Sequence, residues 1–327
     1  MPSRKIEEQL ESLNRLRRAG HADGNAELAI RKALGDRVNI VAARAAELAA
    51  ELQLQVLIPE LLKAFDRFFQ KPVETDPKCW AKEAISKALI DLNFSECEPF
   101  LRGLRHIQME PIWGRQVDTA ATLRSICVLG LLQCTDLTQA EKLKAQTGAL
   151  TDAEAPVRAD AARALAEMEG LEPALLLRLK ARVGDAEPAV TGQVLESLLK
   201  VEGSPAVGFA KEFFEAEDEE IREQAALALG ASRLPEAIAL LIESWKGNRG
   251  SRTRDALLRS ISASRQEDAL RFLLGLIRDG VAADGVSALE ALALHRESAE
   301  IRKRVAEAAR QRQEDSIREA FRRSFPE

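Results

Sequence analysis

The sequence contains no tyrosine, and aromatic residues make up only 4% of its 327 residues. A core with so few rings must be filled by aliphatic side chains, and Leu, Ala, Ile and Val supply them because hydrophobic residues account for 46% of the chain. Leu and Ala favour helices, whereas the clusters of β-branched residues that mark strands are missing. The composition therefore predicts an all-α fold.

Long apolar runs are also absent. The longest uncharged apolar stretch, around residues 126–132, is far shorter than the roughly 20 residues that span a bilayer. The charged, amphipathic start of the chain, Met1 to Leu13, lacks the apolar stretch of a signal peptide. The cysteines form no CxxC pair and are expected to be reduced; they are Cys79, Cys97, Cys127 and Cys134. These features predict a cytoplasmic protein without a membrane partner.

Known catalytic and metal-binding patterns are missing as well. The histidines His21, His106 and His295 are too few and too scattered for a metal site, and the cysteines lack metal-ligand spacing. No GxxxxGK[ST] phosphate loop and no GxSxG nucleophile elbow occurs. We therefore predict no catalytic residue, no bound cofactor and no metal ion, although these absences leave the question of an enzyme open.

What the sequence does contain is a repeat. When the register is fixed on the residue seven before a closing leucine or isoleucine, eight anchor positions recur at spacings of 31 to 42 residues. Seven residues are two helical turns, so each anchor and its closing residue lie on one face of a helix. The anchors are Val41, Lys82, Arg124, Arg158, Thr191, Arg222, Arg254 and Gly285.

Each repeat predicts a first helix, a turn and a second helix. A glycine follows several first helices, where a left-handed residue can end a helix, and a proline then opens the second helix. The glycines are Gly170, Gly203 and Gly230, and the prolines are Pro173, Pro205 and Pro235. The string Thr75-Asp76-Pro77 similarly predicts a cap followed by the first turn of a helix.

The string from Asp152 to Leu165, DAEAPVRADAARAL, resembles the HEAT repeat, particularly the short bacterial type found in phycobilin-lyase-like proteins. The resemblance covers roughly residues 35–310 and is strongest in the repeats anchored at Arg158, Thr191 and Arg222. It implies a right-handed α-solenoid of about eight helix pairs, with the first helices on the convex face and the second helices on the concave face.

We accordingly expect one elongated solenoid over residues 1–327. Amphipathic capping helices are expected at residues 3–19 and 310–325, because end repeats would otherwise expose apolar faces. The expected sections are an N-terminal cap (1–34), longer repeats (35–150), short HEAT-like repeats (151–309) and a C-terminal cap (310–327).

The first repeats are longer, and their extra residues concentrate in connections, notably residues 103–118. This segment is predicted to be a loop, and exposed aromatics and arginines on loops are enriched at binding sites. Its candidate partner-binding residues are Arg105, His106, Trp113 and Arg115. The alternative is that Trp113 folds back to cover a helix end.

The preferred function is a non-enzymatic scaffold that binds a partner protein on the concave face of the solenoid. The exposed positions of the second helices are mainly basic, which favours an acidic helix or tail as the ligand. These positions are Arg178, Arg182, Lys211, Lys246, Arg271 and Arg278. The alternative for each is a solvated charge whose stem covers its neighbours.

Two other function classes stay open. Kinship of the repeat type implies a bilin lyase or chaperone, and an enzyme of the lyase or glycosylase kind predicts a concave pocket with a carboxylate beside an aromatic. A nucleic-acid binder is suggested by a basic feature that comprises Lys246, Arg249, Arg252, Arg254 and Arg259. The net charge of −5 and the lack of tyrosine argue against a nucleic-acid partner.

Overall fold

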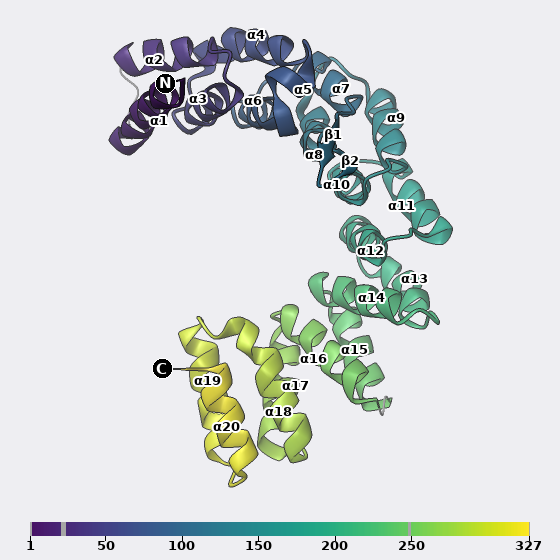
Figure 1. Ribbon diagram of the computed structural model, residues 1–327. Coiled ribbons are helices and arrows are strands. Elements are labelled where there is room, and N and C mark those ends of the chain that lie inside the picture. The colour runs from purple at the N-terminus through teal and green to yellow at the C-terminus, as the bar shows by residue number, and fades with distance from the viewer. Residues whose placement is uncertain (1, 21–23, 248–249, 327) are drawn as a thin grey trace. The chain divides into compact units, whose positions relative to one another are not determined.

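The structure, a computed structural model, describes residues 2–20, 24–247 and 250–326. It divides into two compact units, Met1–Met168 and Glu169–Glu327. Nearly all regular structure is helical (Figure 1), and the exception within the described ranges is one two-stranded sheet. The predicted class, an all-α stack of helix pairs, is therefore confirmed. The predicted sections along the chain stay a prediction.

In unit 1 the predicted anchors lie on helices that pack side by side. These first helices, which we call anchor helices, are α3 (Asn39–Glu51), α6 (Trp80–Asp91), α8 (Ala121–Gly130) and α10 (Ala155–Leu165), and each packs against the next. The other helices of the unit are α1 (Pro2–Ala19), α2 (Gly24–Leu34), α4 (Ile58–Phe68), α5 (Pro72–Thr75), α7 (Glu98–Leu104) and α9 (Gln139–Ala149). Short 3-10 turns cover Gln55–Leu57, Pro77–Cys79 and Leu131–Gln133.

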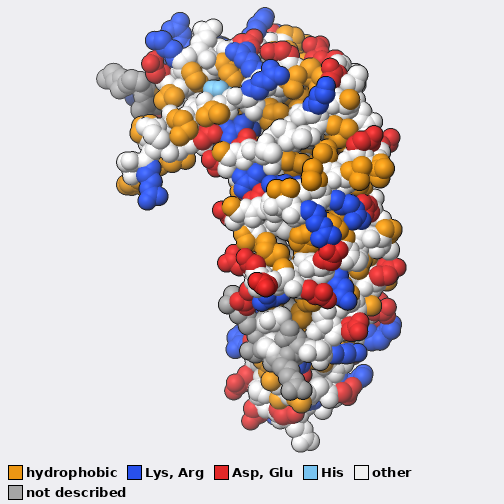
Figure 2. Space-filling model, turned by 90° about the vertical axis from the view of Figure 1, so that its right-hand side faces the viewer, with side chains coloured by type: hydrophobic (Ala, Val, Ile, Leu, Met, Phe, Trp, Pro, Cys, Tyr) orange, Lys and Arg blue, Asp and Glu red, His pale blue; other side chains and the backbone are white. Residues whose placement is uncertain are grey.

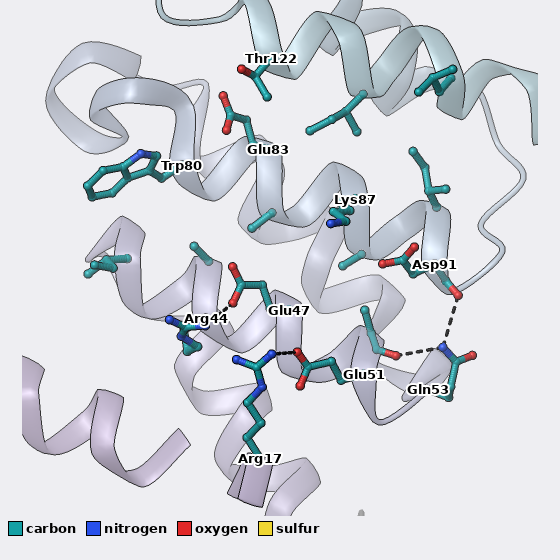
Figure 3. Close-up of a pocket in the computed structure, with 18 residues that line it drawn as sticks. Arg17, Arg44, Glu47, Glu51, Gln53, Trp80, Glu83, Lys87, Asp91 and Thr122 are labelled. Atoms are coloured by element: carbon teal, nitrogen blue, oxygen red, sulfur yellow. Dashed lines mark hydrogen bonds and ion pairs between the residues drawn. The ribbon is translucent and has the colours of Figure 1, made fainter. Parts of the chain in front are cut away.

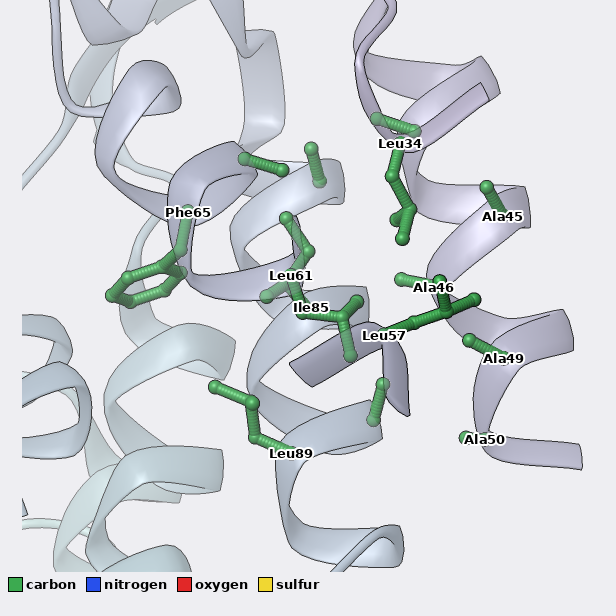
Figure 4. Packing of buried hydrophobic residues seen from close by; sticks show 14 of the residues in the cluster. Leu34, Ala45, Ala46, Ala49, Ala50, Leu57, Leu61, Phe65, Ile85 and Leu89 are labelled. Atoms are coloured by element: carbon green, nitrogen blue, oxygen red, sulfur yellow. The ribbon is translucent and has the colours of Figure 1, made fainter. Parts of the chain in front are cut away.

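The core of unit 1 forms where α3 meets α4 and α6 (Figure 4). Alanines of α3, among them Ala46 and Ala49, face the larger Leu61 of α4 and Ile85 of α6. Burial of each such Leu or Ile stabilises the fold by about 1.5–3 kcal/mol. Small residues on one helix opposite large ones on the next allow a short distance between the helix axes.

The anchor helices form the inner side of unit 1, contrary to the prediction. Figure 1 shows α3 and α6 on the inner side of the curve of this unit, with α2 and α4 on the outer side. The predicted assignment of first helices to the convex face is therefore wrong for unit 1. The physical reason is the row of alanines, because helices with small facing side chains lie closer together and make that row the shorter one.

Unit 2 continues the same alternation of helices. Its anchor helices are α12 (Pro188–Glu202), α14 (Glu219–Ala231), α16 (Ser251–Ala263) and α18 (Ala282–Leu292), and α18 packs against α20 (Asp315–Ser324). The second helices are α11 (Glu172–Val183), α13 (Pro205–Phe214), α15 (Pro235–Gly247), α17 (Glu267–Asp279) and α19 (Ala299–Arg310), and a 3-10 turn covers Ala293–His295. All eight predicted anchors lie inside helices.

The predicted ends of the first helices and starts of the second helices are confirmed, with one correction. Gly203 follows α12 with a left-handed φ of 67°, and the three prolines open second helices. Gly230, however, lies inside α14, where a Cβ atom would meet the backbone oxygen of Ser260 on α16 at 2.2 Å. Its role is therefore close helix packing, and the left-handed residue after α14 is Arg233, with φ 56°.

Most of the segment predicted as a loop, residues 103–118, is instead a β-hairpin over residues 109–118, and residues 103–104 end α7 (Glu98–Leu104). β1 (Met109–Ile112) pairs antiparallel with β2 (Arg115–Asp118), so that Ile112 lies opposite Arg115. The two-residue turn has positive φ at both positions, 49° at Trp113 and 77° at Gly114. This is the backbone of a type I′ turn, whose twist matches that of paired strands.

Candidate functional site

The hairpin stands on a buried polar network at the N-terminal ends of α6 and α8. The Glu110 carboxylate accepts hydrogen bonds from the amide of Gln108 (2.7 Å), the hydroxyl of Thr119 (2.6 Å) and the backbone N–H of Lys78 (2.6 Å). Burial alone would raise the pKa of Glu110, but these hydrogen bonds hold it below its ordinary value. An ionised carboxylate that accepts three hydrogen bonds at Oε1 therefore fixes β1 to the turn that precedes α6.

A buried guanidinium fixes the other strand. Arg124 of α8 donates to Asp118 at the end of β2 (2.6 Å) and to both carboxylate oxygens of Asp152 before α10 (2.8 and 2.9 Å). It also donates to the backbone oxygen of His106 (3.0 Å). Bidentate pairs of this kind set orientation as well as energy. The hairpin is thus held in place relative to α8 and α10.

The third group of contacts that holds the hairpin includes a fully buried ion pair. Lys82 lies 2.9 Å from Asp76, and the same carboxylate caps α6 by accepting from the backbone N–H groups of Ala81 and Lys82. The Asp76 side chain therefore caps free N–H groups of α6 as predicted, but Pro77 lies in the 3-10 turn before the helix and not in its first turn, and the N-cap position is Cys79. The backbone oxygen of Asp76 in turn accepts from the Gln108 side chain at 2.9 Å. The start of the hairpin is thereby tied to the segment that precedes α6, through Gln108 to Asp76 and through Glu110 to Lys78.

The tip of this fixed hairpin is an exposed tryptophan. Trp113 is 100% exposed, so the alternative in which it folds back over a helix end is wrong. A bulky residue with positive φ costs on the order of 1–3 kcal/mol. Folding gains nothing from this cost, since the ring covers no other part of the described chain. Backbone strain that serves no packing is typical of recognition sites, where tryptophan is also enriched.

The other predicted residues of this segment divide into two kinds. Arg105 and Arg115 are exposed, and neither side chain has a hydrogen-bond or ion-pair partner within the described ranges. His106 is half-buried, contacts the Gln108 side chain at 3.0 Å and packs edge-on against Phe69. Burial lowers the pKa of His106. His106 therefore supports the hairpin, whereas the two arginines and Trp113 are available to a ligand.

A groove of about 1400 Å³ runs along the anchor helices of unit 1 (Figure 3). α1, α3, α6 and α8 line it, and its floor is formed by small and aliphatic side chains with Trp80 at one end. The floor residues include Ala43, Ala50, Ala84, Ala88, Ile40, Ile126 and Leu129. Such an apolar floor between charged rims fits the apolar face of an amphipathic helix.

The charged rim of the groove is only partly paired. Arg17 pairs with Glu51, and Arg44 pairs with Glu47 at 2.6 Å. Glu83 lies at the same end as Trp80 (Figure 3). Burial first, and the nearby Asp76 charge second, raise the pKa of Glu83 to about 7, and Lys82 opposes the shift. At neutral pH this carboxyl group is therefore divided between its acidic and ionised forms.

Trp80, Glu83 and Lys87 were not predicted to be site residues from the sequence. The sequence did contain a signal for a shared helix face. Helical spacing places on that face Trp80, Ala84, Lys87 and Asp91. That face is distinct from the buried face on which Lys82 lies. The three lining residues acquire a common role only when α3, α6 and α8 lie side by side.

The six basic residues predicted on second helices lie on α11, α13, α15 and α17 of unit 2, and the structure does not gather them into one site. Lys246 is exposed beside a small hollow. The other five contact carboxylates: Arg178 with Glu202, Arg182 with Glu212, Lys211 with Glu215, Arg271 with Asp268 and Arg278 with Asp279. Their role in partner binding stays a prediction.

The basic residues that suggested a nucleic-acid partner are also partly engaged in contacts within the chain. Arg254 pairs with Asp284 at 2.8 Å and lies over the Trp245 ring, 4.0 Å from its centre. Arg249, like His21, lies outside the described residues, as does the side chain of Arg252. Within the described residues, Arg254 is therefore a packed, ion-paired side chain.

Comparison with known proteins identifies one family. The model of the HEAT repeats family matches residues 208–293, a range that begins within α13 and reaches the end of α18. No curated protein matches the chain. Repeats of this family generally serve as protein-interaction scaffolds. No helix in the described ranges has the length and apolar character needed to cross a membrane.

Proposed function

We propose that this chain, a HEAT-repeat protein, is a non-enzymatic scaffold that binds a partner protein on unit 1. The observation that carries the proposal is the strained, fully exposed Trp113 on a base held by buried ion pairs and hydrogen bonds. Tryptophan and arginine dominate the binding energy of protein interfaces. The tip therefore has the composition of an interface anchor and needs no rearrangement to present it.

The groove adds contact area for a partner protein, which the Trp113 side chain alone does not provide. The hairpin and the groove meet at Lys78, whose backbone N–H binds Glu110 and whose ammonium group lies 5.5 Å from the centre of the Trp80 ring. We propose that an amphipathic helix of the partner lies in the groove while Trp113 contacts the partner beside it. The unpaired Arg105 and Arg115 favour acidic residues in the part of the partner that faces the hairpin.

The predicted basic residues of unit 2, of which Lys246 has no ion-pair partner in the described ranges, would form a second contact with the partner. A cytoplasmic location agrees with the four cysteines, all of which are free thiols.

The test is quantitative affinity purification from cells that make the protein. Trp113→Ala should reduce recovery of a specific partner at least tenfold relative to the unchanged chain. Leu294→Ala is the matched control, because Leu294 is also a large exposed apolar residue but lies in unit 2. A partner recovered equally with Trp113→Ala contradicts the proposal.

A second candidate function rests on the groove end where Glu83 lies with Trp80. A carboxyl group with a pKa of about 7 beside an aromatic ring is the feature that an enzyme of the lyase kind requires. Protein purified from its own cells should then carry a bound pigment or other small molecule, and Glu83→Gln should abolish turnover with little effect on binding. Colourless, ligand-free protein by absorbance and native mass spectrometry would rule this candidate out.

A further inference from the structure

The two strands of the hairpin in unit 1 differ in how far they are covered. Successive residues of a strand point to opposite faces, and three consecutive residues of β2, Arg115, Gln116 and Val117, are all exposed. β1 differs, because its Glu110 is buried in the polar network at the hairpin base. Within the described ranges, β2 is therefore the strand that the chain leaves uncovered.

The pairing register shows which backbone groups of β2 point away from β1. In a hairpin with a two-residue turn, the two residues next to the turn exchange hydrogen bonds, and every second pair after them does the same. The N–H of Thr119 donates to the backbone oxygen of Gln108 at 2.9 Å, which continues this alternation past the strands. Pro111 and Gln116 form a pair of the other kind. The N–H and C=O of Gln116 therefore point outward, and no group in the described ranges bonds to them.

The opposite edge of the hairpin is blunted by proline. Pro111 lies across from Gln116 and has no N–H, so the outer edge of β1 lacks a donor at that position. Proline on an edge strand is one of the devices that prevent pairing with another chain. At the middle of the hairpin, a donor and an acceptor are therefore offered together by β2 and not by β1.

We propose that an extended segment of the partner adds to β2 as a third, antiparallel strand whose backbone bonds to Gln116. This inference rests on the proposed binding of a partner at the hairpin and names the form of the partner segment that lies there. Strand addition takes its affinity from main-chain hydrogen bonds and its specificity from alternate side chains. The buried network already holds the hairpin in place, so binding loses little conformational freedom on this side.

The side chains of β2 indicate the chemistry of the partner segment. Arg115 and Val117 lie on one face of the strand because they are two residues apart. Directly opposite side chains on neighbouring strands lie about 5 Å apart and interact. An acidic residue opposite Arg115 and an apolar residue opposite Val117, themselves two positions apart, complement this face.

Charge favours such a partner over a second copy of this chain. Basic and acidic side chains are interspersed over the face shown in Figure 2, the side where α9 lies in Figure 1. The Arg115 side chain, by contrast, has no ion-pair partner in the described part of the chain. Antiparallel pairing of two β2 strands about Gln116 would place Arg115 opposite Val117 of the second copy, so the guanidinium would still lack a counter-ion.

A synthetic peptide with blocked ends tests strand addition to the full chain without the partner. When the central residue of Thr-Val-Thr-Glu-Thr pairs with Gln116, its Glu lies opposite Arg115 and its Val lies opposite Val117. Millimolar peptide should shift the NMR signal of the Gln116 amide and slow its hydrogen exchange severalfold. The reversed sequence Thr-Glu-Thr-Val-Thr should bind severalfold more weakly, and methylation of the central amide nitrogen should abolish the effect. No shift with the first peptide contradicts the proposal, as does an equal shift with the methylated one.

Substitution of Gln116 separates its backbone from its side chain. Gln116→Pro removes the outward N–H and keeps the bonds between the strands, as Pro111 does on β1. It should reduce recovery of the partner in affinity purification by about tenfold or more. Gln116→Ala keeps the N–H and should recover the partner as the unchanged chain does. Slow exchange of the Val117 amide, which faces β1, verifies that the hairpin of each variant is intact.

Trp113→Ala distinguishes failure of this inference from failure of the proposed function. A partner that is lost with Trp113→Ala but kept with Gln116→Pro supports binding at the hairpin and overturns strand addition. A partner that is kept with both variants overturns both. A dimer of the purified chain that Gln116→Pro abolishes would make a second copy the occupant of the edge and would also overturn the proposal.

Discussion

Individual residues of unit 1 combine structural and potential binding roles within a few positions of one another. Lys82 forms a buried ion pair with Asp76, and Glu83, the next residue, faces the groove. Sequence alone predicted Lys82 as an anchor and Asp76 as a cap, because both follow from helix periodicity and capping chemistry. It did not predict that the two pair, because that contact depends on the turn of residues 77–79 between them.

Lys82→Met should destabilise the protein by about 3–5 kcal/mol, because the substitution keeps the side-chain volume but leaves the Asp76 carboxylate buried without its counter-ion. Urea unfolding followed by circular dichroism measures this difference. Lys87→Met, on the same helix but exposed, is the control and should change stability by less than about 0.5 kcal/mol. Equal effects of the two substitutions would show that the buried pair is not needed.

The raised pKa of Glu83 predicts a defined pH dependence. The folded chain takes up a proton at Glu83 at about pH 7, whereas the unfolded chain does so near 4.5, so the folded state binds more protons between these values. Stability from this group is therefore greatest below about pH 4.5 and is lost as pH rises towards 7. Glu83→Gln should be more stable than the unchanged chain at pH 8, and the two should be equal at pH 4.5. A difference independent of pH would contradict the shift.

At the scale of elements, the helices were predictable and the hairpin was not. Each helix repeats a pattern of apolar and small residues that predicts its existence, and the anchors lie where expected. The hairpin strands are only four residues long, contain Pro111, and are joined by Trp113-Gly114 in place of the Asn-Gly usual in type I′ turns. Trp113 was nevertheless selected from its chemistry, and its full exposure agrees with that choice, while its role in partner binding stays a prediction.

Trp113→Asn should stabilise the fold by about 1 kcal/mol while it weakens partner binding. Asparagine adopts positive φ more readily than tryptophan, and no packing is lost because the ring is fully exposed. Thermal unfolding of this variant tests the predicted gain in stability, and its affinity for the partner tests the predicted loss of binding. A loss of stability on Trp113→Asn would mean that the ring contributes to the fold.

Gly230→Ala should lower the stability of unit 2 by about 1–3 kcal/mol, because the added methyl group would meet the Ser260 backbone and push α14 away from α16. Gly208→Ala is the matched control, since Gly208 also lies in a helix but has open space where the methyl group would go. The control should be neutral or stabilising by up to about 1 kcal/mol. Denaturant midpoints of both variants decide the comparison.

At the scale of the whole molecule, the regular period made the class of fold predictable, because a helix pair buries its apolar face only against its neighbours. The division into two units after Met168 was not predicted. It falls within the fourth predicted repeat, between the helices that hold Arg158 and Pro173, where the sequence pattern shows no interruption. The position of the groove also escaped prediction, since it depends on which row of helices packs more closely.

The central claim is that one partner occupies both the hairpin tip and the groove of unit 1. The most direct measurement places a photoreactive amino acid in turn at position 113, at position 87 in the groove and at position 294 in unit 2, followed by cross-linking in the cells of origin and mass spectrometry. The same protein should be cross-linked from positions 113 and 87 and not from 294. Cross-links to unrelated proteins from the two sites, or an equal yield from position 294, would contradict the claim.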